Sequence, residues 1–258
     1  MENLVLYRVE ERIATITLNR PEKRNALNPQ LILELTEKFI YASEDDAVKV
    51  IVLKANGGSF SAGADLEYLQ QLQQNTFEEN VIDSNNLKKL FTTIYYLPKI
   101  VIAQVEGHAI AGGCGLATIC DIIFATPESS FGYTEVKIGF VPAIVSCFLK
   151  QKVNETIAKE LLLTGKTFTA QEALEYKLIN YVTNSAEINR SVKEFALRLC
   201  SESSGNSLMI TKQLINQTTN PLLEKSLEFA VQINARVRES EDFKKGIASF
   251  LNKEKINW

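Results

Sequence analysis

Two glycine-rich segments could bring backbone amides to a reacting oxygen. They are 56-NGGSFSAGAD-65 and 111-AGGCG-115, and each follows an apolar stretch and opens a predicted helix. The first N–H groups of a helix lack partners within it, the helix dipole favours negative charge there, and small residues let a ligand approach the backbone. Two such turns in one chain predict a pair of amides that hold one oxygen, an oxyanion hole. The alternatives are phosphate binding, although neither turn matches G-x-G-x-x-G or a P-loop, and glycine needed only for packing.

Glu135 is the candidate proton carrier. It lies in 131-FGYTEVKIG-139 between apolar neighbours, where partial loss of solvent would raise its pKa and suit it to proton transfer. A solvated surface glutamate is the alternative, and the local sequence does not decide between the two. His108, the single histidine, is expected to be a packed, hydrogen-bonded structural imidazole, with a direct catalytic part as the alternative. Because the chain has no CxxC or HxxxH spacing, we expect no metal site.

Composition and charge narrow the function classes. The chain has 258 residues, 45% hydrophobic and 23% charged, with a formal net charge of −3 and no basic face or tail, so nucleic acid is not an expected partner. Its longest apolar runs, such as 100-IVIAQV-105, have the length of a strand, so no membrane span is expected. The first residues do not show the pattern of a signal peptide, and four scattered cysteines do not suggest a disulfide framework. These features favour a cytoplasmic protein.

The order of apolar and polar segments predicts an α/β fold. Alternation in 4–18 predicts two strands joined by a turn at Glu10 and Glu11. Residues 66–86 are polar and rich in Gln and Asn, and we expect a mobile helix-loop cover there, followed by a separate helix at 87–97. The other predicted elements are helices 29–45, 115–120, 145–153, 154–165 and 169–177 and strands 48–55, 99–107, 121–125 and 178–182. Periodicity alone leaves open a doubly wound sheet or a spiral of β-β-α turns.

Six segments resemble the crotonase (enoyl-CoA hydratase/isomerase) family in order and spacing. They are 18-LNRPEKRNALN-28, 60-FSAGADLEYL-69, 106-EGHAIAGGCGLATICDIIFA-125, 131-FGYTEVKIGFVPA-143, 163-LTGKTFTAQEALEYKLIN-180 and 240-SEDFKKGIASFLNK-253. The resemblance covers nearly the whole chain and implies a crotonase-like spiral of β-β-α turns in 1–200, with the CoA site and the active site. It also implies a C-terminal helical trimerisation region in 201–258, CoA thioester substrates, and a homotrimer or a dimer of trimers.

The resemblance also implies the catalytic groups. Backbone N–H groups of Ala62 and Gly112 would form the oxyanion hole, and Glu135 would move the proton. The chain departs from the family at Gly115, where hydratases typically have the first of two glutamates, and 139-GFVPAIVSCFL-149 lacks the usual G-x-G-G-T-Q run. A two-carboxylate mechanism is therefore not implied.

The departure at Gly115 shapes the expected reaction. A glycine at this position, followed by the T-E-V-K-I-G-x-x-P-A-x-x-S pattern, makes the chain similar to a branch of bacterial 3-methylglutaconyl-CoA hydratases, which work in leucine breakdown. Gly115 would then leave room for a branched acyl group and remove a charge that repels its carboxylate. The alternatives are an enoyl-CoA isomerase with one shuttling glutamate, a decarboxylase or other acyl-CoA enzyme, and a non-catalytic CoA-binding or scaffold homologue.

The CoA-binding residues are expected in three segments. Coenzyme A would enter as part of the substrate, and no other cofactor is expected. The resemblance places Lys23, Arg24 and Ala26 near the nucleotide, and Ala62, Gly63, Ala64, Asp65 and Leu66 along pantetheine and adenine. It places Gly112 and Gly115 near the acyl group. Phe243, Lys244 and Lys253 would reach the CoA of a neighbouring subunit. For the lysines, a solvated helix surface is the alternative. Asp65 could equally cap the helix that follows Ala64.

Overall fold

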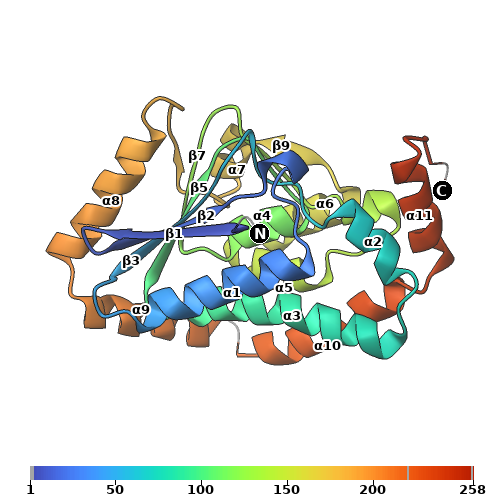
Figure 1. The fold of residues 1–258 in the computed structure, drawn as a ribbon, viewed down its shortest axis with the longest axis horizontal. Coiled ribbons are helices and arrows are strands. Elements are labelled where there is room, and N and C mark those ends of the chain that lie inside the picture. Colours follow the sequence, from blue (N-terminus) through green and yellow to red (C-terminus); the bar gives the residue numbers. More distant parts are fainter. Residues whose placement is uncertain (1–2, 220, 257) are drawn as a thin grey trace.

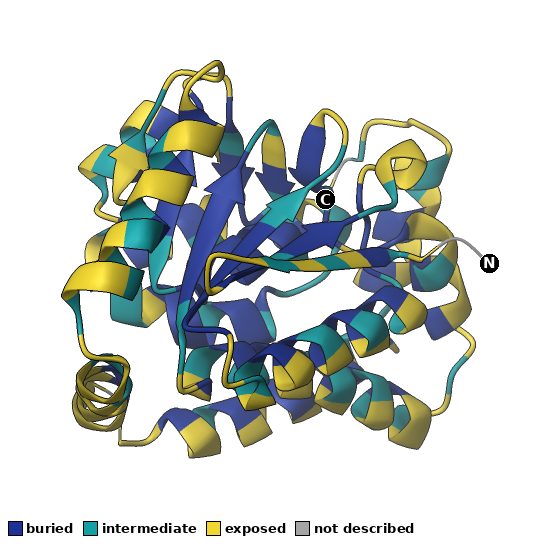
Figure 2. Ribbon diagram, turned by 60° about the vertical axis from the view of Figure 1, so that its left-hand side comes forward, coloured by how far each residue is buried: buried dark blue, intermediate teal, exposed yellow. Residues whose placement is uncertain are grey.

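The computed structural model describes residues 3–219, 221–256 and 258, and it confirms the α/β architecture (Figure 1). The two regions expected from the resemblance, 1–200 and 201–258, include residues 1–2, 220 and 257, which lie outside the described residues. Two sheets form the centre of the molecule, and helices cover them. The inner strands of the larger sheet are buried, whereas its first strand is partly exposed and the covering helices expose their outer sides (Figure 2).

The larger sheet has six strands in the order β1-β2-β3-β5-β7-β10. Their bounds are β1 (Val5–Glu10), β2 (Ile13–Leu18), β3 (Val50–Ala55), β5 (Ile100–Val105), β7 (Ile122–Ala125) and β10 (Tyr181–Val182). β1 and β2 pair antiparallel, with Glu10 opposite Ile13, which confirms the predicted hairpin. The other neighbours pair parallel, and parallel pairs need long crossover connections.

The smaller sheet has four strands in the order β4-β6-β8-β9. They are β4 (Ser59–Ser61), β6 (His108–Ile110), β8 (Ser130–Gly132) and β9 (Thr167–Thr169). Each of β3, β5 and β7 in the larger sheet is followed along the chain by one strand of the smaller sheet and then by a helix or helical turn. This repetition is the spiral of β-β-α turns, which decides against the doubly wound sheet.

The register of the smaller sheet places the candidate chemistry at one edge. β4, β6 and β8 run parallel, so their carboxyl ends meet at the same side of the sheet. Residues 62–65 follow β4, residues 111–115 follow β6, and Glu135 comes soon after β8. Three segments separated by some 50 and 20 residues in the sequence are thereby brought together.

The helices of the first 204 residues follow the predictions, apart from one helix at Ile188–Glu202 that was not predicted and one correction. Their bounds are α1 (Pro29–Glu44), α2 (Leu66–Leu72), α3 (Phe77–Tyr96), α4 (Gly112–Thr118), α5 (Ala143–Lys152), α6 (Glu155–Thr164), α7 (Ala170–Glu175) and α8 (Ile188–Glu202), with 3₁₀ turns η1 (Pro21–Lys23) and η2 (Glu135–Ile138). The separate helix expected at 87–97 is wrong, because α3 already begins at Phe77. Thr76 and Glu79 form a capping box that starts it, and Asn80 and Ser84 are buried on its inner side.

Three helices form the C-terminal region: α9 (Gly205–Thr219), α10 (Leu223–Val237) and α11 (Glu241–Leu251). α10 packs on α3 and α5, and α11 packs on α2 and η2, at the opposite end of the molecule from α8 (Figure 1). α9 buries only Lys212 and Asn216 among its described residues, while apolar side chains such as Leu214 and Ile215 stay exposed. Within the described parts of the chain, every helix is too short or too polar to cross a membrane.

Candidate active site

A cavity of about 600 Å³ lies at the edge where β4, β6 and β8 end. Both glycine-rich turns line it, through Ala62, Ala64, Ala111 and Gly112, and so does Glu135. Most of the remaining lining is apolar. Helices α2, α3, α10 and α11 complete the wall, so the site lies between the spiral and the C-terminal helices.

The first turn is held by backbone hydrogen bonds to the segment before α1. The Leu27 N–H donates to the Gly63 carbonyl at 2.7 Å, and the Asp65 N–H donates to the Leu27 carbonyl at 2.9 Å. Leu27 and Ala64 thus pair like neighbouring residues of parallel strands. In such a pair the N–H of Ala64 points away from Leu27, and among the described residues it has no acceptor.

The choice of Ala62 for the oxyanion hole is wrong. Its N–H donates to the Arg24 carbonyl at 3.0 Å, so it is not available to a ligand. Ala64, two residues further on, lines the same cavity and has the free N–H. The sequence resemblance therefore identified the correct turn and the wrong amide.

The second turn carries a strained residue. Ala111 has φ 50° and ψ −123°, a conformation that residues with a side chain rarely adopt. Its own N–H donates to the Gly132 carbonyl at 2.7 Å, and its carbonyl accepts from Gly115 at 3.0 Å, the first bond of α4. The N–H of Gly112 lies ahead of that bond and has no acceptor within the described chain.

The two turns touch each other at Gly63. A β-carbon built on Gly63 would lie 2.9 Å from the Ala111 Cβ and the Ile110 carbonyl, and 3.5 Å from the Gly112 nitrogen. Gly63 also has φ +86°, so only glycine suits this position. The free amides of Ala64 and Gly112 are consequently neighbours, and together they can hold one negatively charged oxygen.

Glu135 is a buried carboxyl with an unused oxygen. It is the first residue of η2 and 7% exposed, and its Oε2 has no hydrogen-bond partner in the described structure. Burial raises the pKa of Glu135 from 4.5 to about 7, against the opposing effect of its own backbone N–H. A carboxyl with a pKa near neutrality can both accept and return a proton. The surface-glutamate alternative is therefore excluded.

Gly115 does not open a space for the substrate. A β-carbon there would lie 2.3 Å from the Val145 Cγ1 and 3.0 Å from the Phe91 ring. Val145 lines the cavity, and Gly115 is buried behind it. The expectation that Gly115 leaves room for a branched acyl group is wrong, because hydrocarbon side chains already fill that position.

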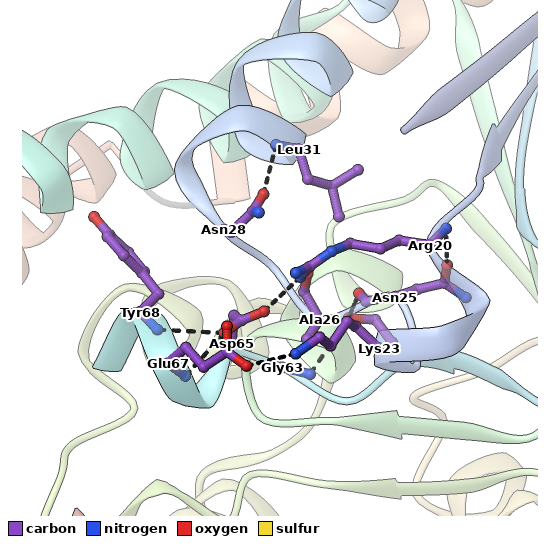
Figure 3. Close-up of polar contacts among 11 residues, drawn as sticks. Arg20, Lys23, Asn25, Ala26, Asn28, Leu31, Gly63, Asp65, Glu67 and Tyr68 are labelled. Carbon is purple, nitrogen blue, oxygen red and sulfur yellow. Dashed lines mark hydrogen bonds and ion pairs between the residues drawn. The ribbon is translucent and has the colours of Figure 1, made fainter. Parts of the chain in front are cut away.

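Arg20, which the sequence reasoning missed, fixes the start of α2 (Figure 3). Its Nη1 pairs with the Asp65 carboxylate at 2.5 Å and donates to the Ala26 carbonyl at 3.2 Å. Asp65 caps α2 by accepting from the N–H groups of Glu67 and Tyr68, which confirms the capping role proposed for it. Burial would raise the pKa of Asp65, but the hydrogen bonds from Arg20 and from the α2 amides hold it below its ordinary value.

Other predicted binding residues divide into two groups. Leu66 lines the cavity, whereas Lys23 and Arg24 lie exposed on η1 and just after it, with Lys23 paired to Glu67 at 2.6 Å (Figure 3). Phe243 is fully buried against Leu69, Leu72 and Ile247 of its own chain. Its predicted reach to a neighbouring subunit's CoA is wrong. Lys253 is exposed after α11, and Lys244 pairs with Glu241 at 2.8 Å.

His108 is hydrogen-bonded but not packed. It begins β6, is exposed, and its Nδ1 lies 2.7 Å from the Ser130 hydroxyl. It does not line the cavity of the amide turns. The expected hydrogen bond is confirmed, and the expected burial is wrong, because His108 is exposed at the first position of β6.

The chain is similar over nearly its whole length to proteins of one family. Residues 8–258 match the family described as Enoyl-CoA hydratase/isomerase. A Thermus thermophilus protein, provisionally named an enoyl-CoA hydratase, is 40% identical over 241 residues, which are 93% of this chain and 95% of that protein. The crotonyl-CoA hydratase of Syntrophomonas wolfei is 31% identical over 259 residues, with 100% of this chain and 98% of that protein covered. A crystal structure of an enoyl-CoA hydratase from Mycobacterium avium superposes with a TM-score of 0.89 at 32% identity, and the match covers 100% of both chains.

Proposed function

Because the chain belongs to the enoyl-CoA hydratase/isomerase family, we propose that it adds water across the double bond of an enoyl-CoA thioester at the cavity of the two amide turns. The observation that carries the proposal is the meeting of two free N–H groups, from Ala64 and Gly112, with the unpaired carboxyl oxygen of Glu135 in one cavity. A thioester enolate needs an oxyanion hole and a proton carrier, and this site offers both.

The reaction follows from these groups. The amides of Ala64 and Gly112 hold the thioester oxygen, which draws electrons from the double bond. Glu135, as carboxylate, takes a proton from water while the hydroxide oxygen bonds to C3. The negative charge collects on the thioester oxygen, and Glu135 then gives the proton to C2. One water is consumed, and the carboxyl returns to its starting form.

For the acyl group we retain 3-methylglutaconyl as the finer proposal. The sequence similarity around Gly115 and 134–146 supports this proposal. A space beside Gly115 does not support it, because Val145 and Phe91 fill that position. The isomerase is the second candidate, since Glu135 is the carboxyl that follows β8 at the edge where the amide turns lie, whereas Asp83 and Glu254 line the cavity from α3 and from the segment after α11. A single carboxyl suffices to carry a proton from C2 to C4.

A panel of CoA thioesters separates these reactions. Methylglutaconyl-, crotonyl- and 3-hexenoyl-CoA are incubated with the enzyme, and the products are analysed by chromatography and mass spectrometry. We expect the first two to gain the mass of one water. A 3-enoyl thioester that changes retention time at constant mass would favour the isomerase. No product from any thioester would favour the non-catalytic alternative.

We also propose that the chain assembles as a homotrimer or a dimer of trimers. Its support is the exposed apolar surface of α9 and α10, where Ile210, Leu214, Ile215 and Phe229 are each more than 40% exposed. Light scattering at micromolar concentration should give three or six times the chain mass of 28.9 kDa. A monomer under these conditions would contradict the proposal.

A further inference from the structure

A buried polar cluster joins α3 and α10 beside the cavity. We call it the α3–α10 cluster; its members are Asn80, Asp83, Ser84, Asn234 and Arg238. Arg238 is 4% exposed, and its Nη2 pairs with the Asp83 carboxylate at 2.6 Å. Its Nη1 donates to the Asn80 side-chain and backbone oxygens at 3.2 and 3.3 Å. Two of its three nitrogens therefore have partners in the cluster.

The third nitrogen of Arg238 is not engaged. Its Nε–H is buried and has no acceptor in the described structure, and the same holds for the Asn80 Nδ2. Buried donors without an acceptor are rare in proteins because they lose their bonds to water and gain none in return. The cluster therefore needs an additional oxygen acceptor.

The cluster belongs to the cavity that contains Glu135. Arg238, Asp83 and Asn234 all line that cavity. The Arg238 guanidinium lies over the Phe140 ring at 5.8 Å from its centroid, and the Phe140 N–H donates to the Glu135 carbonyl at 3.1 Å. A substrate held at the amide turns can thus extend its acyl chain toward Arg238.

The charges of the cluster are balanced without a ligand. Arg238 and Asp83 offset each other, and Tyr68, which donates a hydrogen bond to Asp83, is neutral because burial and then Asp83 raise its pKa. The unmet requirement is thus for a hydrogen-bond acceptor. An acyl chain ending in a methyl group would leave the Nε–H unpaired in a drier site.

We propose that Arg238 recognises an oxygen at the far end of the acyl chain, so that the preferred substrates are enoyl thioesters with an oxygen-bearing chain end. This inference rests on the proposed function and names its substrate class. A hydroxyl and a carboxylate both supply the acceptor, and they share the same contact with the Nε–H. Arg238 acts here as a specificity residue and takes no part in the bond changes.

The test compares three six-carbon trans-2-enoyl-CoA thioesters that end in a methyl, a hydroxyl or a carboxylate group. We expect kcat/KM to be at least about tenfold higher for one or both oxygen-bearing chains than for the methyl chain. Arg238→Lys keeps the charge opposite Asp83 and removes the Nε–H, and it should reduce the ratio to about one. Arg236→Lys, an exposed substitution on the same helix, should leave the ratio unchanged.

The ratio distinguishes recognition from mere stability, because a loosened fold lowers the rate with all three thioesters alike. If Arg238→Lys does not fold, the neutral pair Arg238→Met with Asp83→Asn takes its place. Equal kcat/KM for the three thioesters in the unmodified enzyme would overturn the inference while leaving the hydratase proposal intact. Absence of hydration with all three would overturn the proposed function itself.

Discussion

The two turns that present free amides differ in the contacts that restrict them most. The first, around Ala64, is fixed by polar contacts: backbone bonds to Leu27 and the Arg20–Asp65 ion pair. The second, around Gly112, is fixed by contact between atoms, because a β-carbon on Gly113 would lie 2.5 Å from the Ser61 carbonyl. The first turn should therefore be sensitive to loss of a partner, and the second to the addition of a single carbon.

The largest effect is expected from Glu135→Gln, which leaves both turns intact and removes the proton carrier. We expect kcat to fall by about 10³-fold with little change in affinity for the thioester. Steady-state kinetics and binding by calorimetry measure the two quantities. The rate that remains reports what the amide pair achieves alone, and a near-normal kcat would remove Glu135 from the mechanism.

The same variant has a predicted pH signature in stability. The pKa of Glu135 is about 7 in the folded chain and 4.5 ordinarily, so the folded state keeps the proton between these values while the unfolded state has lost it. The unmodified enzyme should therefore lose about 3 kcal/mol as the pH rises from 4.5 to 7, and Glu135→Gln should lose less. Denaturant unfolding at pH 4.5, 6 and 8 measures the difference.

The second largest loss of activity is expected from Gly63→Ala, since this substitution disturbs both turns at once. The added carbon meets the Ala111 Cβ and the Ile110 carbonyl, and φ +86° strains any side chain. Displacement of one or both amides should lower kcat/KM by about 10²-fold. Gly58→Ala is the matched control, because nothing lies within 4 Å of its β-carbon. Equal rates for the two variants would show that the turns do not depend on each other.

Arg20→Gln tests the polar support of the first turn alone. Asp65 would remain buried without its counter-ion, so the free energy of unfolding should fall by about 3 kcal/mol. We expect kcat/KM to fall by about tenfold, because Ala64 keeps its neighbours but loses the anchored start of α2. Arg8→Gln, which breaks an exposed pair with Glu10, serves as the comparison and should change neither quantity.

Ala111→Gly should have the smallest effect, and it should raise the stability of the fold instead of lowering it. Glycine tolerates φ 50° and ψ −123°, so the variant should be more stable by about 1 kcal/mol. Because the Gly112 amide keeps its place, kcat/KM should stay within about twofold. A large loss of rate would mean that the strain at Ala111 itself holds the amide in position.

Most of the fold was predictable from the sequence, because apolar runs and helix caps are local signals. The hairpin, the alternation of strands and helices, and the start of α1 at Pro29 all came out as expected. The start of α3 did not, because the polar residues 77–86 look like a loop until Asn80 and Ser84 are seen to face a buried partner helix. A capping box at Thr76 and Glu79 was the available signal.

The site was predictable only in outline. The glycine-rich sequences identified both turns, and the family resemblance identified Glu135. Which N–H is free depends on pairing with residues 24–27, which lie nearly 40 positions away. The error at Gly115 has a similar origin, since the missing side chain suggests a space that Val145 and Phe91 occupy. The roles of Arg20 and Arg238 were not predicted, because their partners Asp65 and Asp83 are distant in the sequence.

Hydratases of the family typically have a second glutamate at the position of Gly115, and here hydrocarbon side chains fill that volume. The difference has a consequence for the stereochemistry of the reaction. Val145 occupies the volume beside Gly115, so Glu135 is the carboxyl left near the amide turns, and in the proposed reaction it would face the planar enoyl group from one side. The oxygen that reaches C3 and the hydrogen that reaches C2 must then arrive on the same face, in a syn addition. The hydrogen at C2 is also the one that the attacking water has just released. In a mixture of light and heavy water, its isotope content should reflect a single bound water molecule, provided that the carboxyl passes its proton on before exchanging it with solvent.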